Sequence, residues 1–234
     1  MSLTFKSHSE VALAQVLATD LMVVKAARTS SNNQDNDLPE EKVKGLINYL
    51  MKKRHGTPFE HNMFTFAIDT PIMVVRQFFR HRVGWSYNEL SGRYSEIPME
   101  FYMPSDDRPL QQIGSSAHPD LVEGTDHQRQ VLEQVFTEVY HTAEESYHFL
   151  LNAGIAREVA RTILPLGTFT RFYTTCNARS LMHFLSLRVN SEEATYESKP
   201  QAEIDEVARV IETYFAEAMP HTYEAFVKNG RVAP

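Results

Sequence analysis

The sequence predicts an α+β fold: a single domain over residues 1–234, with a small, mainly antiparallel sheet surrounded by helices, including one long helix. Stretches in which apolar residues recur every three or four positions alternate with a few short β-rich stretches. One helical pattern, at about 126–152, is much longer than the others. No repeat and no linker long enough to separate two domains occurs, and 42% of the 234 residues are apolar, enough for one core.

The first third of the chain contains two helical patterns and one strand pattern. Residues 11–24 form an apolar stretch, and residues 30–39 (SSNNQDNDLP) are polar and turn-prone, which indicates a loop. The segment that begins at Pro39 has regularly spaced apolar residues, acids in its first turn and bases in its last, so it predicts a helix. The elements expected next are a loop over 55–62, a strand over 63–69 and a helix from Pro71 to about Arg82.

The rest of the chain is predicted to be mainly helical. Residues 104–120 have the composition of a loop. In the long helix that follows at about 126–152, Val131, Val135 and Val139 lie four residues apart. The remaining expected elements are a short helix at 155–163, a strand at 168–175, and helices at 178–188 and 201–217.

Composition excludes several classes of protein. The net charge of −7 argues against a general nucleic-acid binder. No run of 18 apolar residues predicts a membrane helix, and the N-terminus lacks the pattern of a secretory signal, so we expect a cytoplasmic protein without a membrane partner. The single cysteine, Cys176, rules out an internal disulfide framework.

Two segments reverse the acidic average. Residues 71–95 carry four arginines against Glu89, and residues 157–188 carry five against Glu158, with no lysine in either segment. Arginine is the side chain that grips phosphate or carboxylate with two parallel hydrogen bonds. The pattern therefore favours binding of small anions at defined places. The alternative is that these arginines form structural ion pairs with acids elsewhere in the chain.

The segment Arg80–Tyr94 has the densest set of hydrogen-bonding side chains. It follows a predicted helix on which Gln77, Arg80 and His81 lie on neighbouring turns, and it lacks the apolar periodicity of a surface helix. Arginines suit phosphates, whereas amides and hydroxyls suit ribose and base edges. We interpret the segment as a nucleotide-binding loop, and the alternative is a solvated surface loop.

The predicted helix 178–188 carries a second set of polar residues. Arg179 and His183 share one face, because successive residues of a helix are about 100° apart. Arg188 falls on the opposite, apolar side and must find an anion or several acceptors, since an unpaired buried charge is very unfavourable. It meets either a core carboxylate or a ligand. Asn177 occupies a helix N-cap position, and capping alone would explain it.

Other common sites are not indicated. No HExxH spacing and no cysteine cluster occurs, so we expect no metal. Cys176 has no histidine base beside it in the sequence, which favours a small buried residue over a nucleophile. The glycine motifs of dinucleotide folds and of phosphate-binding loops are both absent, so another device must hold any phosphates.

These motifs together resemble the flavin-dependent thymidylate synthases. Arg80-His81-Arg82, followed by eight residues and Ser91, is similar to the family signature, with one residue more before Ser86 than in some members. The resemblance extends over most of the chain. Its other blocks, in the family's order, are Ala26–Ser30, His55–His61, Arg161–Pro165 and Asn177–Arg188.

The resemblance implies a reductive methylation of dUMP to dTMP for dTTP synthesis. The one-carbon donor would be 5,10-methylenetetrahydrofolate, and NADPH would supply the reducing equivalents through FAD. It also implies a homotetramer with active sites shared between subunits. The residues that it places near FAD are His55, Thr57, Arg80, His81, Arg82, Glu89, Asn177, Ala178, Arg179 and His183. Those that it places near dUMP are Gln77, Phe78, Phe79, Arg80, Glu89, Leu90, Ser91, Gly92, Arg93, Arg161 and Arg188.

Within that family, Arg188 is the candidate catalytic residue. The uracil ring must become electron-rich at C5, and an arginine beside it can stabilise the negative charge that develops on the ring. Ser91 is interpreted as a hydrogen-bond donor to the nucleotide phosphate. Two other classes of function stay open: a nucleotide or flavin sensor without turnover, and a single-strand nucleic-acid binder that uses Trp85, Tyr87 and Tyr94.

Overall fold

The computed structural model describes residues 3–31, 38–115 and 118–234. The chain divides into two compact units, and each consists of several separate segments. The first unit comprises Met1–Ser9, Asp69–Arg76 and Glu89–Arg171, and the second comprises Glu10–Ile68, Gln77–Asn88 and Phe172–Pro234. The single domain over residues 1–234 stays a prediction.

The first unit contains two small pairs of strands and the longest helix. Strands β1 (Thr4–Lys6) and β5 (Glu100–Tyr102) pair in parallel, and β6 (Gln111–Ser115) and β7 (His118–Val122) pair antiparallel. The helices that lie wholly in this unit are α4 (Asp126–Asn152), α5 (Arg157–Ala160) and the 3-10 helix η2 (Arg161–Ile163).

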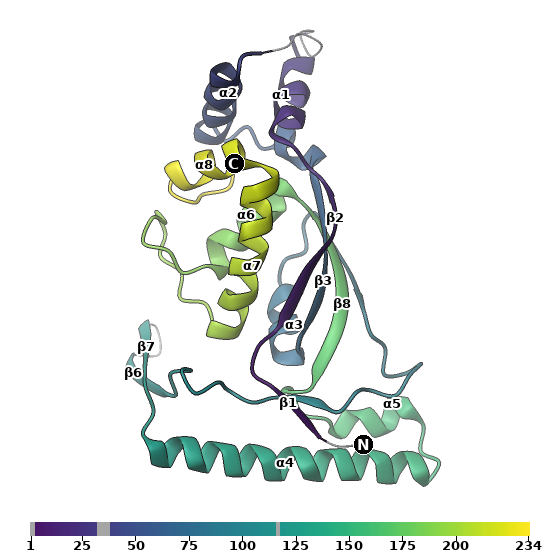
Figure 1. The fold of residues 1–234 in the computed structure, drawn as a ribbon. Helices are drawn as coiled ribbons and strands as arrows, with labels where there is room; N and C mark the ends of the chain where they lie inside the picture. The colour runs from purple at the N-terminus through teal and green to yellow at the C-terminus, as the bar shows by residue number, and fades with distance from the viewer. Residues whose placement is uncertain (1–2, 32–37, 116–117) are drawn as a thin grey trace. The chain divides into compact units, whose positions relative to one another are not determined.

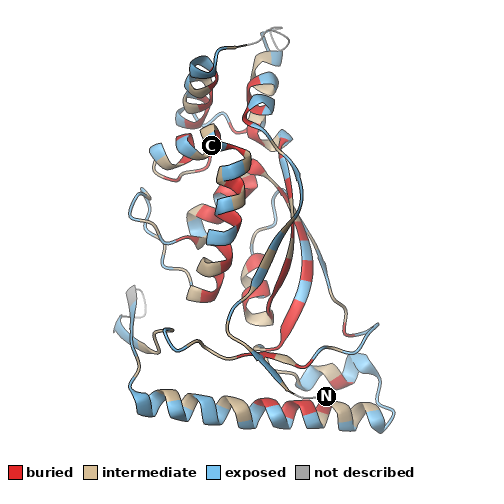
Figure 2. Ribbon diagram, in the orientation of Figure 1, coloured by how far each residue is buried: buried red, intermediate tan, exposed pale blue. Residues whose placement is uncertain are grey.

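Helix α4 is fixed at its start by a capping box and at its middle by aromatic packing. The Thr125 hydroxyl accepts a hydrogen bond from the Gln128 backbone, and the Gln128 side chain reaches back to the Thr125 backbone. Tyr140 stacks on Phe101 of β5 at 4.7 Å, and Tyr147 is fully buried. The core of this unit therefore packs against the middle of α4. Figure 2 shows that the two ends of α4 are more exposed.

The second unit contains most of the other helices. They are α1 (Asp20–Thr29), α2 (Glu40–Lys52), the 3-10 helix η1 (Thr57–His61), α6 (Ala178–Arg188), α7 (Ala202–Ala218) and α8 (Pro220–Lys228). Buried Asp20, the first residue of α1, connects this helix to α8. Its carboxylate accepts hydrogen bonds from the backbone N–H groups of His221 and Thr222 at the start of α8.

A four-stranded sheet has the strand order β2-β3-β8-β4 (Figure 1). Its strands are β2 (Glu10–Leu17), β3 (Met63–Pro71), β4 (Trp85–Glu89) and β8 (Phe169–Asn177), and α3 (Ile72–Phe78) follows β3 directly. Alternate residues of β3 and β8 are buried, as expected for a sheet with one covered face. Phe64 of β3 meets Phe215 of α7 edge to face, which shows that α7 helps to cover that face.

The predicted α+β class and the long helix are confirmed, and the long helix and 178–188 match within a residue. The predicted helix from Pro71 to about Arg82 is too long. It ends at Phe78, and the Tyr87 hydroxyl lies 2.8 Å from the carbonyl oxygens of both Phe78 and His81. The His81 backbone N–H also donates to the Phe78 carbonyl, so the chain makes a tight turn here in place of a further α-helical turn.

Two predicted loops contain strands. Residues 104–120 include β6 and the start of β7, although residues 116 and 117 lie outside the described residues. The polar segment after Arg82 includes β4, whose backbone pairs with β8 although its side chains lack a clear apolar alternation. Among the described residues, no helix is long and apolar enough to span a membrane.

Candidate functional site

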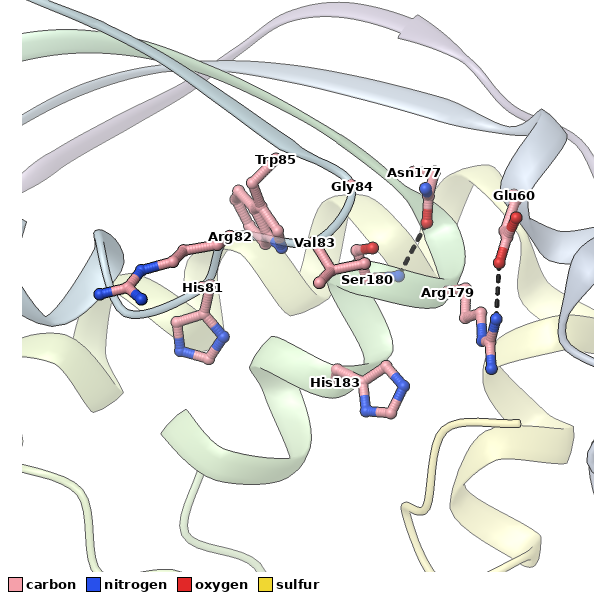
Figure 3. Close-up of a pocket in the computed structure, with 10 residues that line it drawn as sticks. All are labelled: Glu60, His81, Arg82, Val83, Gly84, Trp85, Asn177, Arg179, Ser180 and His183. Atoms are coloured by element: carbon pink, nitrogen blue, oxygen red, sulfur yellow. Dashed lines mark hydrogen bonds and ion pairs between the residues drawn. The ribbon is translucent and has the colours of Figure 1, made fainter.

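A cavity of about 570 Å³ in the second unit brings together the two polar segments singled out in the sequence (Figure 3). One wall comes from the chain after α3 and the other from the first turns of α6. Glu60 of η1 lies at one edge, beside Arg179. The lining residues are Glu60, His81, Arg82, Val83, Gly84, Trp85, Asn177, Arg179, Ser180 and His183.

The N-terminus of α6 faces this cavity. Asn177 caps the helix, and its side-chain oxygen accepts a hydrogen bond of 2.8 Å from the Ser180 backbone. Arg179 and His183 lie one turn apart on the same face, as predicted, and both line the cavity. A helix N-terminus with an arginine beside it is a favourable place for a phosphate group.

Gly84 lets the opposite wall approach α6 closely. Its φ of +69° is a conformation that residues with a Cβ rarely adopt, and an added Cβ would lie 2.6 Å from Asn177 Nδ2. Just after this turn, the Trp85 ring packs against Phe184 of α6 at 5.4 Å. The backbone turn and the indole ring therefore hold this wall of the cavity against α6.

Beside the cavity, Arg188 is held by two neutral groups. Its Nε donates a hydrogen bond of 3.2 Å to His81 Nε2, and its Nη1 donates one of 3.4 Å to Gln77 Oε1. Burial, together with the smaller effect of the neighbouring charges of Arg188 and His183, lowers the pKa of His81 to about 4. His81 is therefore neutral at pH 7 and can accept with Nε2 while its proton sits on Nδ1.

The positive charge of Arg188 has no carboxylate partner among the described residues. Burial and the charge of Arg80 lower the pKa of Arg188, but an arginine remains charged at pH 7. The structural alternative for this residue, a core carboxylate, is thus absent from the part of the chain that the structure describes. What remains is a preoriented guanidinium that lacks an anion.

The neutral state of His81 predicts a pH dependence of stability. Below pH 6.5 the unfolded chain binds a proton at this histidine, whereas the folded chain resists it down to about pH 4, so stability falls as pH drops through this range. We expect a loss of about 1–2 kcal/mol between pH 7 and pH 5 after allowing for solvent screening. Urea unfolding at the two pH values measures it.

The matched variants are His81→Asn and His127→Asn, of which the second removes an exposed histidine of α4. His81→Asn should reduce the difference in unfolding free energy between the two pH values, and His127→Asn should leave it unchanged. An unaltered pH dependence in His81→Asn would contradict the assignment.

A second group of predicted residues lies in the first unit. Leu90, Gly92 and Arg161 line a cavity of about 240 Å³ together with Glu89, whose carboxylate accepts a hydrogen bond of 2.9 Å from the Thr170 hydroxyl. An added Cβ at Gly92 would lie 2.6 Å from Ile97 Cδ1 and 3.1 Å from Arg161 Cδ, so the glycine leaves room for both side chains.

The remaining predicted residues have varied surroundings. Phe78 is fully buried and Phe79 is partly exposed against Tyr87. Ala178 is buried in the first turn of α6. The other positions are Thr57 at the start of η1, His55 with its ring edge against Tyr49, exposed Arg80, and Ser91, whose hydroxyl accepts from the Arg93 backbone.

The ion-pair alternative describes part of the arginine set. Arg93 pairs with Glu158 at 2.9 Å, Arg171 pairs with Asp69 at 2.9 Å, and Arg179 pairs with Glu60. Among the described residues, neither Arg82 nor Arg188 has an acidic partner within ion-pair distance. The structure thus separates arginines that have a carboxylate partner from those that have none among the described residues.

Sequence reasoning missed Glu60 and Ser180 as lining residues, although Glu60 lies inside the quoted block His55–His61.

Cys176 is fully buried, and burial raises the pKa of its thiol well above the usual range. Such a thiol is not poised as a nucleophile. Among the described residues, no group of three or more His, Cys, Asp or Glu side chains is arranged to hold a metal ion.

The sequence matches a family model described as thymidylate synthase complementing protein over residues 12–221. It is 50% identical to the flavin-dependent thymidylate synthase of Streptomyces avermitilis, over 99% of this chain and 96% of that protein. It is 47% identical to the enzyme of the same name from Thermotoga neapolitana, over 93% of this chain and 90% of that protein.

Solved structures agree with this match. The UMP/dUMP methylase PolB from Streptomyces cacaoi, bound with 5-Br UMP, superposes with a TM-score of 0.93 and 46% identity, over 99% of both chains. Its complex with 5-Br dUMP gives a TM-score of 0.94 over 99% of this chain and 100% of that one.

Proposed function

This chain belongs to the family of thymidylate synthase complementing proteins, and we propose that it works as a flavin-dependent thymidylate synthase that methylates dUMP to dTMP. The one-carbon donor is 5,10-methylenetetrahydrofolate and the reductant is NADPH. A methylene group plus a hydride makes the methyl group, so the folate leaves as tetrahydrofolate. We place this chemistry in the cytoplasm, where these substrates are found.

The residues of the larger cavity fit FAD. Two arginines, Arg82 and Arg179, and the N-terminus of α6 supply positive charge for phosphates, and the Trp85 ring supplies an aromatic wall. We assign His55, Thr57, Arg80, His81, Arg82, Glu89, Asn177, Ala178, Arg179 and His183 to the cofactor. When bound, FAD would accept a hydride from NADPH and supply the reducing equivalents for the new methyl group.

The surroundings of Arg188 are the observation that supports the proposal most directly. Arg188 has a charged guanidinium, held by His81 and Gln77, with no acid to neutralise it among the described residues. Next to the uracil ring of dUMP it would stabilise the negative charge on N3 and the neighbouring oxygen. That charge makes C5 nucleophilic without a covalent adduct. The buried Cys176 is consistent with a reaction that uses no cysteine nucleophile.

We assign to the nucleotide the residues that the family resemblance implies, which are Gln77, Phe78, Phe79, Arg80, Glu89, Leu90, Ser91, Gly92, Arg93, Arg161 and Arg188. Because the Phe78 ring is buried in the core, it can meet a ligand only through its backbone. The Ser91 hydroxyl and the guanidinium groups of Arg93 and Arg161 suit the phosphate of dUMP.

We propose a homotetramer with active sites shared between subunits. Val131, Val135 and Val139 of α4 are 45%, 48% and 50% exposed and form one apolar stripe, since they lie four residues apart. The sequence pattern alone indicates a core face, but the core side of α4 is formed by Tyr140, Tyr147 and their neighbours. A stripe of this kind is typical of a helix that packs against another subunit.

Purified protein should be yellow and should oxidise NADPH in a dUMP-dependent manner, with dTMP as the product when methylenetetrahydrofolate is present. A parallel assay with UMP measures whether the ribonucleotide is also methylated, since the superposed relative PolB is a UMP/dUMP methylase. Flavin binding without dTMP formation would favour the sensor, and strong salt-dependent affinity for single-stranded DNA would favour the nucleic-acid binder.

A further inference from the structure

The side chain of Arg179 is fixed by two groups from distant parts of the sequence. Its Nη1 donates a hydrogen bond of 2.6 Å to Glu60 Oε1 of η1, and its Nε donates one of 2.6 Å to the backbone carbonyl of Pro234. Neither contact uses Nη2. Figure 3 shows the Glu60 contact at the edge of the cavity, with Arg179 between η1 and the start of α6.

Gly56 makes room for this arrangement. It precedes η1, and an added Cβ would lie 2.6 Å from Arg179 Cζ and 2.8 Å from the Pro234 carbonyl oxygen. The backbone φ of Gly56 is −76°, which any residue can adopt. What the glycine provides here is therefore the absence of a side chain under the guanidinium, not conformational freedom.

The segment that ends at Pro234 is itself anchored. Arg231 is 3% exposed, and its Nη2 lies 2.7 Å from Glu212 Oε1 of α7, although the angle is outside hydrogen-bond range. The Arg231 backbone N–H donates to the Phe226 carbonyl, and Ala233 is 2% exposed. The Pro234 carbonyl is thus presented by packed structure and can serve as a fixed acceptor.

These contacts have a consequence for anion binding. The carboxylate of Glu60 offsets the positive charge of Arg179. The pair therefore attracts a ligand anion less strongly than a free arginine would, and charge alone does not explain why the pair lies here. A long arginine side chain loses rotamer freedom when it is immobilised. Fixing it before the ligand arrives removes that loss from the binding step. The pair therefore has less net positive charge than a free arginine, but its guanidinium is already oriented when the ligand binds.

We propose that Glu60 and the Pro234 carbonyl are positioning groups that aim Arg179 at the flavin. The inference rests on the proposed function, because it takes Arg179 to contact FAD. Glu60 itself holds Arg179 and does not touch the cofactor. The prediction is that Glu60 contributes to flavin affinity only through Arg179.

A double-mutant cycle on FAD affinity tests this. Trp85 is the single tryptophan of the chain and lines the cavity, so quenching of its fluorescence during FAD titration of the apoprotein reports on the site. We expect Glu60→Ala to raise the Kd about five- to tenfold, and Glu60→Gln, which keeps an acceptor, to raise it about two- to threefold. Arg179→Ala should raise it at least as much as Glu60→Ala.

The decisive result is the double variant. In the Arg179→Ala background, Glu60→Ala should add no further loss of FAD affinity. Gly56→Ala should behave like Glu60→Ala in both backgrounds, and it decides the test if Glu60→Ala does not fold. Glu217→Ala, which removes an exposed carboxylate of α7, is the matched control and should leave the Kd unchanged.

Different failures point to different errors. If Arg179→Ala weakens FAD binding while Glu60→Ala does not, the positioning role is wrong and the proposed function stands. If the two losses multiply in the double variant, Glu60 acts independently of Arg179 and the inference is again wrong. If the unmodified protein does not bind FAD, the proposed function itself fails.

Discussion

Arg188→Ala is expected to lower dUMP-dependent turnover by about 10²–10³-fold, the effect of removing one preorganised donor to a developing anion. Flavin binding should persist, because the guanidinium donates to His81 and Gln77 and does not line the larger cavity. Steady-state rates of dTMP formation and the flavin absorbance of the purified variant measure the two properties separately.

Arg188→Lys is the informative companion variant. It keeps the charge but loses the planar fork that bonds His81 and Gln77 at once, so it should recover only a small part of the rate. Arg209→Ala is the control, since Arg209 is half exposed and donates to Asp205 and to the Asn190 carbonyl. Turnover by Arg188→Ala within a few-fold of the unmodified rate would remove Arg188 from the catalytic step.

The parts of this site that follow local rules could be predicted from the sequence. Helix α6 begins and ends where its cap and apolar spacing indicate. The sequence alone therefore predicts that Arg179 and His183 share one face and that Arg188 lies opposite. The long helix α4 could be predicted for the same reason, since its capping box and spacing are strong local signals.

Features that depend on long-range contacts could not be predicted. The contact of the Tyr87 hydroxyl with the last carbonyl of α3 joins residues nine positions apart, which no periodicity reveals. The Glu60–Arg179 pair joins residues 119 positions apart. The apolar stretch at 11–24 gave no boundary between β2 and α1. The structure shows that boundary to be capped by Thr19, whose side chain accepts from the Met22 backbone.

The same distinction applies to residues placed at the site by resemblance. Phe78 and Phe79 are adjacent in the sequence and were both assigned to the nucleotide. In the structure Phe78 is fully buried, whereas Phe79 is 37% exposed. A motif identifies positions, but burial decides whether a side chain can reach a ligand. For Phe78 the structure favours a supporting role beneath the site.

Phe78→Ala should destabilise the protein by about 3–5 kcal/mol, the range for removing a fully buried phenylalanine. The Phe78 ring stacks on Phe184 at 4.9 Å and meets Phe172 and Trp85 edge to face. Because Trp85 lines the larger cavity and rests on this cluster, the variant should also weaken FAD binding without removing a ligand contact. Urea unfolding gives the first quantity, and quenching of Trp85 fluorescence gives the second.

Phe79→Ala is the matched comparison, because it removes the same side chain one position later. Phe79 is partly exposed, and the centre of its ring lies 4.9 Å from that of Tyr87. Its loss should therefore reduce the unfolding free energy by about 1 kcal/mol. The contrast isolates burial from residue type and from sequence position. Equal destabilisation by the two variants would show that the aromatic cluster under Trp85 does not hold this wall of the cavity in place.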